Sequence, residues 1–243
     1  MSASPHFSSR KAFWQAAIVL LAIDLALLLA YVLVYLLKSL GLLAAAPDLL
    51  RIETQWGLGS VLMYLKWLAI IGLLSLSWRQ LREPLLLSLA LIFLFFLIDD
   101  SLGIHERIGT ELMRQLGLEG AWGLRGNDFG KLTYWALAGG ACLAVFIVGY
   151  VPSNRRTRRL GQLFLLGIAG LVLVGIGIDL VGVLAKQLDA GFVGRAVRFG
   201  LRTAEDGGEM ILGSLLLALA YAIFKDLPAT IAAADWRSAY RAA

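Results

Sequence analysis

The chain has 243 residues, of which 59% are hydrophobic and 16% are charged, and its formal net charge is +5 at pH 7. Several nearly uncharged runs of about twenty residues match the roughly 30 Å hydrocarbon core of a bilayer, which indicates a polytopic membrane protein rather than a soluble domain. Basic loops that set membrane topology account for the excess positive charge, so no nucleic-acid partner is expected.

Six apolar runs follow one another along the chain. Each must be helical because lipid offers no hydrogen-bond partner to the backbone, so the predicted fold class is all-α, a six-transmembrane-helix bundle. The first run is too long for a signal-peptide core and is expected to be retained. The domains are a tail over 1–12, the membrane domain over 13–226 and a tail over 227–243. The predicted spans are Phe13–Leu37, Trp56–Trp78, Pro84–Gly103, Leu132–Val151, Leu160–Lys186 and Glu205–Phe224.

Two features refine this outline. An Ile-Asp step recurs in the odd-numbered spans, ending at Asp24, Asp99 and Asp179, which is compatible with three pseudo-repeated helical hairpins, although matches this short also arise by chance. The segments Ile104–Gly117 and Gly191–Thr203 alternate apolar and basic residues in helical fashion. They are therefore expected to form helical extensions or caps on the outer membrane face.

The loops predict the topology. The two shortest connections, "RQLRE" and "PSNRRTRR", are dense in arginine, whereas the longer ones mix both charge signs. Because short cytoplasmic loops carry an excess of Lys and Arg, these two loops and both termini are expected in the cytoplasm. The expected location is a cell membrane, taken as a bacterial inner membrane.

Ionisable residues gather near the outer ends of three spans. At 1.5 Å per residue, Asp99, Asp179 and Glu209 lie about 22, 28 and 22 Å from the inner ends of their spans, and therefore in one outer layer. Charged groups in spans are costly and usually face a bundle interior or a wet cavity. The predicted cation or metal site comprises Asp99, Asp100, His105, Glu106, Asp179, Glu205, Asp206 and Glu209.

So many acids cannot all remain ionised at close range unless a counter-charge is present. Carboxylates with one imidazole suit a divalent metal, which is the candidate cofactor, although the Glu-x-x-His spacing of di-metal bundles is missing. In the alternative, arginines neutralise the acids, since Arg195, Arg198 and Arg202 share a helical face just before Glu205. If the protein is instead an enzyme acting on lipids, the same three arginines are expected to hold an anionic head group. A proton could also occupy the site.

A second pair lies deeper. Asp24 and Lys66 fall at similar depth in an antiparallel hairpin, so an ion pair near the membrane midplane is expected. It serves either to fix helix registry or as a transport element.

These features favour a membrane protein with an outward-facing acidic and histidine site that binds a cation, in ion or small-solute transport. The alternatives are a membrane-embedded, metal-dependent hydrolase or transferase acting on lipid head groups, and a structural subunit whose acids are bridged to arginine. The expected partners are the bilayer and a lipid or small cationic ligand. Only two histidines occur and no P-loop is present, so neither haem nor nucleotide is expected.

Overall fold

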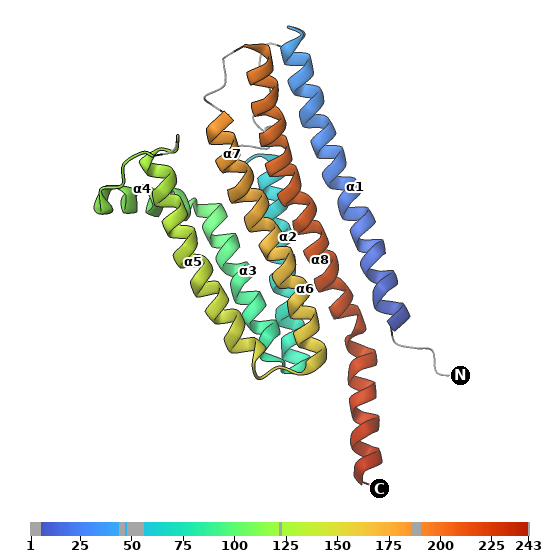
Figure 1. Cartoon of the computed structure of the whole chain (residues 1–243). Helices are drawn as coiled ribbons and strands as arrows, with labels where there is room; N and C mark the ends of the chain where they lie inside the picture. Colours follow the sequence, from blue (N-terminus) through green and yellow to red (C-terminus); the bar gives the residue numbers. More distant parts are fainter. Residues whose placement is uncertain (1–5, 44–46, 48–55, 122, 186–190, 243) are drawn as a thin grey trace.

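The computed structural model describes residues 6–43, 47, 56–121, 123–185 and 191–242, and the elements formed by these residues are helices. Figure 1 shows their arrangement. The elements are α1 (His6–Ser39), α2 (Leu58–Leu81), α3 (Pro84–Leu102), α4 (Ile104–Leu116), α5 (Gly126–Tyr150), α6 (Arg155–Val172), the π-helix η2 (Leu173–Gly177), α7 (Ile178–Ala185) and α8 (Phe192–Ala242).

Six helical segments of the described residues are long and apolar enough to span a membrane, which confirms the predicted all-α fold with six candidate spans. The fifth predicted span ended at Lys186, which lies outside the described residues. The sixth was predicted too short, because α8 begins at Phe192 and runs without a break into the last span. The segments are Arg10–Ser39, Leu58–Leu81, Pro84–Leu102, Gly126–Tyr150, Arg155–Val183 and Val193–Leu227.

The bundle has two distinct ends. One, here called the proximal end, carries the start of α1, the α2–α3 turn and the start of α6 (Figure 1). The other, the distal end, carries α4 and the start of α5 and α8. Within the bundle α8 packs against α1, α2, α6 and α7, while α3 packs against α2, α5 and α6. Since α2 contacts both α3 and α8, the third and sixth spans are held around a shared neighbour.

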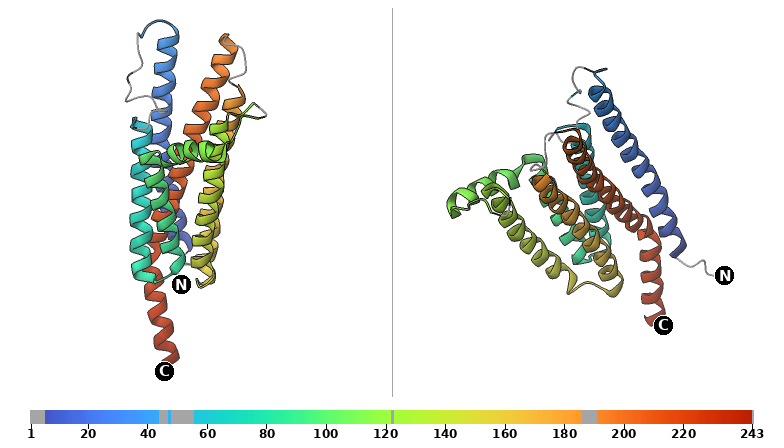
Figure 2. Two further views of the ribbon diagram at one scale, coloured as in Figure 1. Left: turned by 90° about the vertical axis from the view of Figure 1, so that its left-hand side faces the viewer. Right: turned by 45° about the horizontal axis from the view of Figure 1, so that its top comes forward.

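The short helix α4 lies across the distal end rather than along the bundle (Figure 2). Gly103 and Gly117 both take a left-handed backbone at φ 59°, which glycine adopts without a steric cost, and they end α3 and α4 respectively. The predicted helix over Ile104–Gly117 is thus confirmed to within one residue. Gly130 allows α5 to approach closely, because a Cβ there would overlap the carbonyl oxygen of Gly109 in α4.

Aromatic and aliphatic side chains fill the bundle between its two ends. Trp67 of α2, Phe93 of α3 and Phe164 of α6 are almost fully buried, and their ring centroids lie 5.4 Å (Trp67–Phe93) and 5.9 Å (Phe93–Phe164) apart. Aromatic clusters of this kind combine a large buried area with directional ring contacts. The core therefore fixes the helices that present the acidic residues at the distal end.

Candidate functional site

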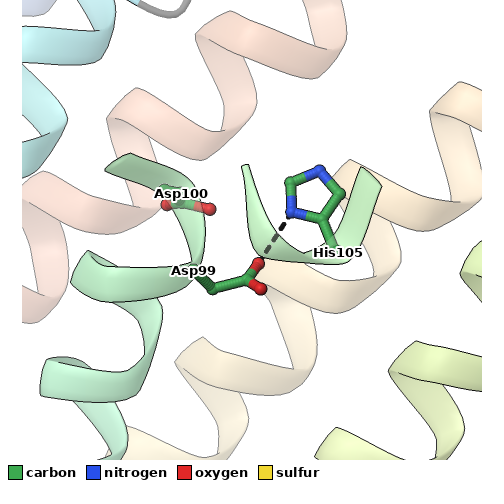
Figure 3. A group of neighbouring side chains, drawn as sticks. All are labelled: Asp99, Asp100 and His105. Atoms are coloured by element: carbon green, nitrogen blue, oxygen red, sulfur yellow. Dashed lines mark hydrogen bonds and ion pairs between the residues drawn. The ribbon is translucent and has the colours of Figure 1, made fainter. Parts of the chain in front are cut away.

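The acidic stretch of the third span lies at a sharp turn. Asp99 and Asp100 occupy the last turn of α3, and Gly103 is at once the C-cap of α3 and the residue before α4. Its left-handed backbone turns the chain abruptly, and its N–H donates to the Asp99 carbonyl. The turn brings His105, in the first turn of α4, back over the Asp99 side chain (Figure 3).

Asp99 is fully buried and both of its oxygens are hydrogen-bonded. The Tyr134 hydroxyl of α5 donates to Oδ1 at 2.6 Å, and His105 Nδ1 lies 2.7 Å from Oδ2. A buried carboxylate requires such partners to offset its lost hydration. Asp99 therefore orients the His105 ring and does not itself face open space.

His105 is held on a second side by Trp135, whose ring centroid lies 5.5 Å from that of the imidazole. Burial alone lowers the pKa of His105, but the hydrogen bond that His105 makes to Asp99 and the negative charges of Asp99, Asp100 and Glu106 outweigh burial and raise it above 6.5. Because Nδ1 is bound to Asp99, the other ring nitrogen is the one left to meet a ligand (Figure 3).

Asp100 follows Asp99 at the end of the same helix, and its side chain has other partners (Figure 3). Trp67 Nε1 donates to its Oδ2 at 3.2 Å, and the Tyr64 hydroxyl donates to its backbone carbonyl at 3.2 Å. One ligand atom each from Asp99, Asp100 and His105 can be chosen so that all three lie within 4.8 Å of one another. Within this group the short Asp99–His105 distance is their hydrogen bond, so Asp99 supports His105 from behind while Asp100 and His105 line the open space.

A cavity of about 280 Å³ opens beside these residues, and we call it the distal cavity. It joins side chains from α2 to α8, so acids that are far apart in the sequence face one space. Its ionisable lining residues are Asp100, His105, Asp128, Lys131, Asp179, Glu205 and Glu209. Its other lining residues are Trp67, Phe96, Leu132, Trp135, Leu171, Val172, Gly175, Ile176 and Leu180.

One wall of the distal cavity contains an irregular turn. Residues Leu173–Gly177 form the π-helix η2 between α6 and α7, and such turns are rare in helices and frequent at functional sites. Glu209 of α8 packs its carboxylate on the backbone of Gly175, where an added Cβ would overlap Glu209 Oε1. The charges of Asp100, Asp179, Glu205 and Asp206 all act on Glu209. This glycine thus gives Glu209 its place in the cavity wall.

Two lining residues were missed because the fourth span was predicted to begin only at Leu132. The helix begins at Gly126, and the side chain of Asp128 accepts from the Arg125 backbone N–H at 2.8 Å and from its guanidinium at 2.9 Å. The acid three residues into the helix in "RGNDFG" is the signal that could have shown this start. Lys131 follows one turn later and lies 3.7 Å from Glu106.

The predicted cluster therefore divides into two groups. Asp100, His105, Asp179, Glu205 and Glu209 line the cavity. Three others lie outside the lining: Asp99 is behind His105, Glu106 is exposed on α4 beside Lys131, and Asp206 is half-buried on α8.

A family model described as "Domain of unknown function (DUF8692)" matches residues 16–224, which covers all of these cavity residues. The chain belongs to the DUF8692 family. No curated protein and no solved structure matches it.

In this DUF8692 chain the structure brings Asp24 and Lys66 into contact. Lys66 Nζ lies 2.6 Å from Asp24 Oδ1 and donates to the Met210 carbonyl at 2.9 Å, while Ser214 donates to Asp24 Oδ2 at 2.6 Å. Asp24 is 0% and Lys66 2% exposed. Each oxygen of the carboxylate has a partner, so the pair ties α1, α2 and α8 together as a registry element does.

The three arginines that were expected to neutralise the acids begin α8. Arg195 and Arg202 are exposed and Arg198 is half-buried, and none of the three is among the described residues that line the distal cavity. The charge of Arg202 acts on Glu205 from outside the cavity, and Lys131 acts on it from within the lining. In the DUF8692 chain the cavity acids therefore outnumber the cations that face them.

Proposed function

We propose that this protein binds a divalent metal ion in the distal cavity. The observation that carries the proposal is that Asp100 and His105 share one cavity with Asp179, Glu205 and Glu209. Carboxylate oxygens with one imidazole nitrogen form a donor set suited to manganese, iron or zinc. Asp128 already pairs with Arg125, and Lys131 is one cation against the other four carboxylates of the lining, so a bound metal ion would supply the missing positive charge.

The support for His105 as a ligand comes from its partner. Histidine ligands almost always donate their second ring N–H to a carboxylate or carbonyl, which fixes the ring and raises its basicity. Asp99 has this relation to His105, and Tyr134 in turn holds Asp99. The cavity volume of about 280 Å³ leaves room for an ion with part of its water shell, since one water occupies about 30 Å³ in the liquid.

We propose ion or small-solute transport as the use of this site. The supporting feature is η2, a π-helical turn within a continuous spanning segment beside the acids, because such turns are frequent at functional sites. The arginine-rich turns at the proximal end support a topology with both termini in the cytoplasm of a bacterial inner membrane, and hence an outward-facing cavity.

A second candidate function is metal-dependent hydrolysis or transfer on a lipid head group. Two observations favour it: Asp100 and His105 lie at the distal end of the third span, close to where head groups would be, and Lys131 would hold an anionic group beside the metal. A metal-bound water would be the nucleophile, and lipid would reach it laterally from the bilayer.

The binding proposal is tested by titrating the purified full chain with Mn²⁺ in a calorimeter. Glu209→Gln should weaken binding by at least about tenfold, since it removes one charged ligand, while Glu119→Gln, an exposed acid outside the cavity, should leave binding unchanged. Equal Mn²⁺ affinity in the wild type, Glu209→Gln and Glu119→Gln would overturn the proposed site.

The choice between transport and enzymatic use of the metal site is tested in proteoliposomes. Mn²⁺ accumulation that Glu209→Gln abolishes and Glu119→Gln retains supports transport. Mn²⁺-dependent release of head group from the vesicle lipid, without accumulation, would overturn transport in favour of the enzyme.

A further inference from the structure

A second and larger hollow lies at the proximal end, and we call it the proximal pocket. Its volume is about 800 Å³, and it is bounded by α1 near residue 10, the α2–α3 turn, the start of α6 and α8 near residue 223. It shares no described lining residue with the distal cavity. Its lining residues are Arg10, Phe13, Leu81, Glu83, Asn154, Arg155, Arg156, Thr157, Arg159, Leu160, Leu163, Leu219, Ala222, Ile223, Asp226 and Leu227.

The polar part of this pocket is cationic. Arg10, Arg155 and Arg159 are exposed and form no hydrogen bond or ion pair with another described residue. The two acids of the lining already have partners: Arg156 lies 3.2 Å from Asp226, and the Asn154 backbone N–H donates to Glu83 at 3.1 Å. Three guanidinium groups therefore remain available to an anion.

The rest of the pocket is apolar and lies deeper in the membrane. Leu163 is two turns beyond Arg155 on α6, about 12 Å further along the helix, and Leu219 is two turns before Leu227 on α8. Phe13 and Ile223 complete this wall from α1 and α8. A ligand that satisfies both parts needs an anionic group at the membrane surface and a hydrocarbon portion that runs inward.

We propose that the proximal pocket binds an anionic phospholipid of the leaflet that it faces. Arg10, Arg155 and Arg159 would contact the phosphate, and the acyl chains would lie against the apolar wall between α1, α6 and α8. Guanidinium groups are suited to phosphate because they present paired N–H donors. The depth matches, since Arg10 and Arg155 begin their spans and Leu227 ends the sixth. The proposal is independent of the distal cavity and of its metal.

The test is a titration of the full chain in detergent with dioleoylphosphatidylglycerol, with bound lipid counted by native mass spectrometry. Arg155→Gln/Arg159→Gln should weaken binding by roughly thirtyfold, as expected for two basic residues at an anionic surface. The matched control is Lys11→Gln/Arg79→Gln, which removes the same charge at the same end from exposed residues outside the pocket lining. It should change the affinity by less than about twofold.

Two further probes separate the sources of affinity. Dioleoylphosphatidylcholine, which is zwitterionic, should bind at least about tenfold more weakly than the glycerol lipid, and glycerol phosphate without chains should not compete. Equal weakening by the two double variants would show general surface attraction and overturn the site. Equal binding of both lipids, or full competition by glycerol phosphate, would also overturn it. A dimer that dissociates on adding lipid would assign the pocket to a second copy instead.

Discussion

Replacing Asp99 by Asn should disable the distal site without removing a ligand. Asp99 accepts two short hydrogen bonds, from Tyr134 at 2.6 Å and from His105 at 2.7 Å, in a fully buried position. A carboxamide has one acceptor oxygen. If that oxygen keeps Tyr134, the amide N–H groups face His105 Nδ1 and force its proton onto the nitrogen that the metal needs.

The magnitude follows from this geometry. Loss of the carboxylate that orients a histidine ligand typically costs 10- to 100-fold in metal affinity, and we expect Asp99→Asn to fall within about this range for Mn²⁺. Tyr134→Phe is the matched control: it removes one donor and keeps the charge, so its effect should stay below about tenfold.

The assay is calorimetric titration of Mn²⁺ into each protein at the same pH, because protons compete with the metal for His105. Nuclear magnetic resonance of the metal-free protein should show the pKa of His105 above 6.5 in the wild type and lower in Asp99→Asn, since the variant lacks the charge that raises it. Wild-type affinity in Asp99→Asn, or a His105 pKa that does not move, would refute the role assigned to Asp99.

Three further changes have defined outcomes. Gly175→Ala should displace the Glu209 carboxylate and weaken Mn²⁺ binding. The control is Gly177→Ala in the same turn, which should bind Mn²⁺ normally because its Cβ would meet only Leu173, at an ordinary 3.7 Å. Equal Mn²⁺ affinities of the two variants would contradict the contact between Gly175 and Glu209. Lys66→Met should destabilise the protein by about 3–5 kcal/mol in thermal unfolding because it leaves Asp24 buried and uncompensated, and Asp24→Leu/Lys66→Met should recover most of this loss. The folded-state pKa of His105 lies above its usual 6.5, so its ion pair with Asp99 stabilises the metal-free protein below about pH 6.5 and loses that contribution as the pH rises through the folded value. The difference in melting temperature between wild type and His105→Gln should therefore shrink between about pH 6 and about pH 8. A difference that grows over this range would contradict the stabilising ion pair between His105 and Asp99.

The spans could be predicted from the sequence because length and hydropathy alone determine which runs can cross a bilayer. The depth of a residue along its span was also predictable, since a rise of 1.5 Å per residue places Asp179 and Glu209 in one layer. The same depth count predicted that Asp24 lies beside Lys66. The sequence predicted that α4 is a helix, but not its direction relative to α3. That direction is set by the left-handed backbone of Gly103, which turns the chain so that His105 lies over Asp99.

The direction of each side chain could not be predicted, because it depends on how the helices pack. Asp99 and Asp100 are neighbours on α3, about 100° apart around the helix, and only the packing of α2 and α5 decides that Asp100 faces the cavity while Asp99 meets Tyr134. Hydropathy placed the start of the fourth span too late, since the polar residues of "GNDFGK" lower the average there. Asp128 and Lys131 were lost from the predicted site for that reason.

The proximal pocket could not be predicted either, because it also depends on how the helices pack. Its arginines were assigned to topology alone, because the loop "PSNRRTRR" gives no indication that α1 and α8 line one pocket with the start of α6. Only the assembled bundle places Arg10 next to Arg155 and Arg159 over an apolar wall.

The most direct measurement is elemental analysis of the purified protein. The distal cavity predicts a stoichiometric divalent metal in the wild-type protein and in Glu119→Gln, and its loss in Glu209→Gln. Absence of bound metal from all three after incubation with Mn²⁺, iron and zinc salts, or equal metal content in Glu209→Gln and the wild type, would contradict the assignment.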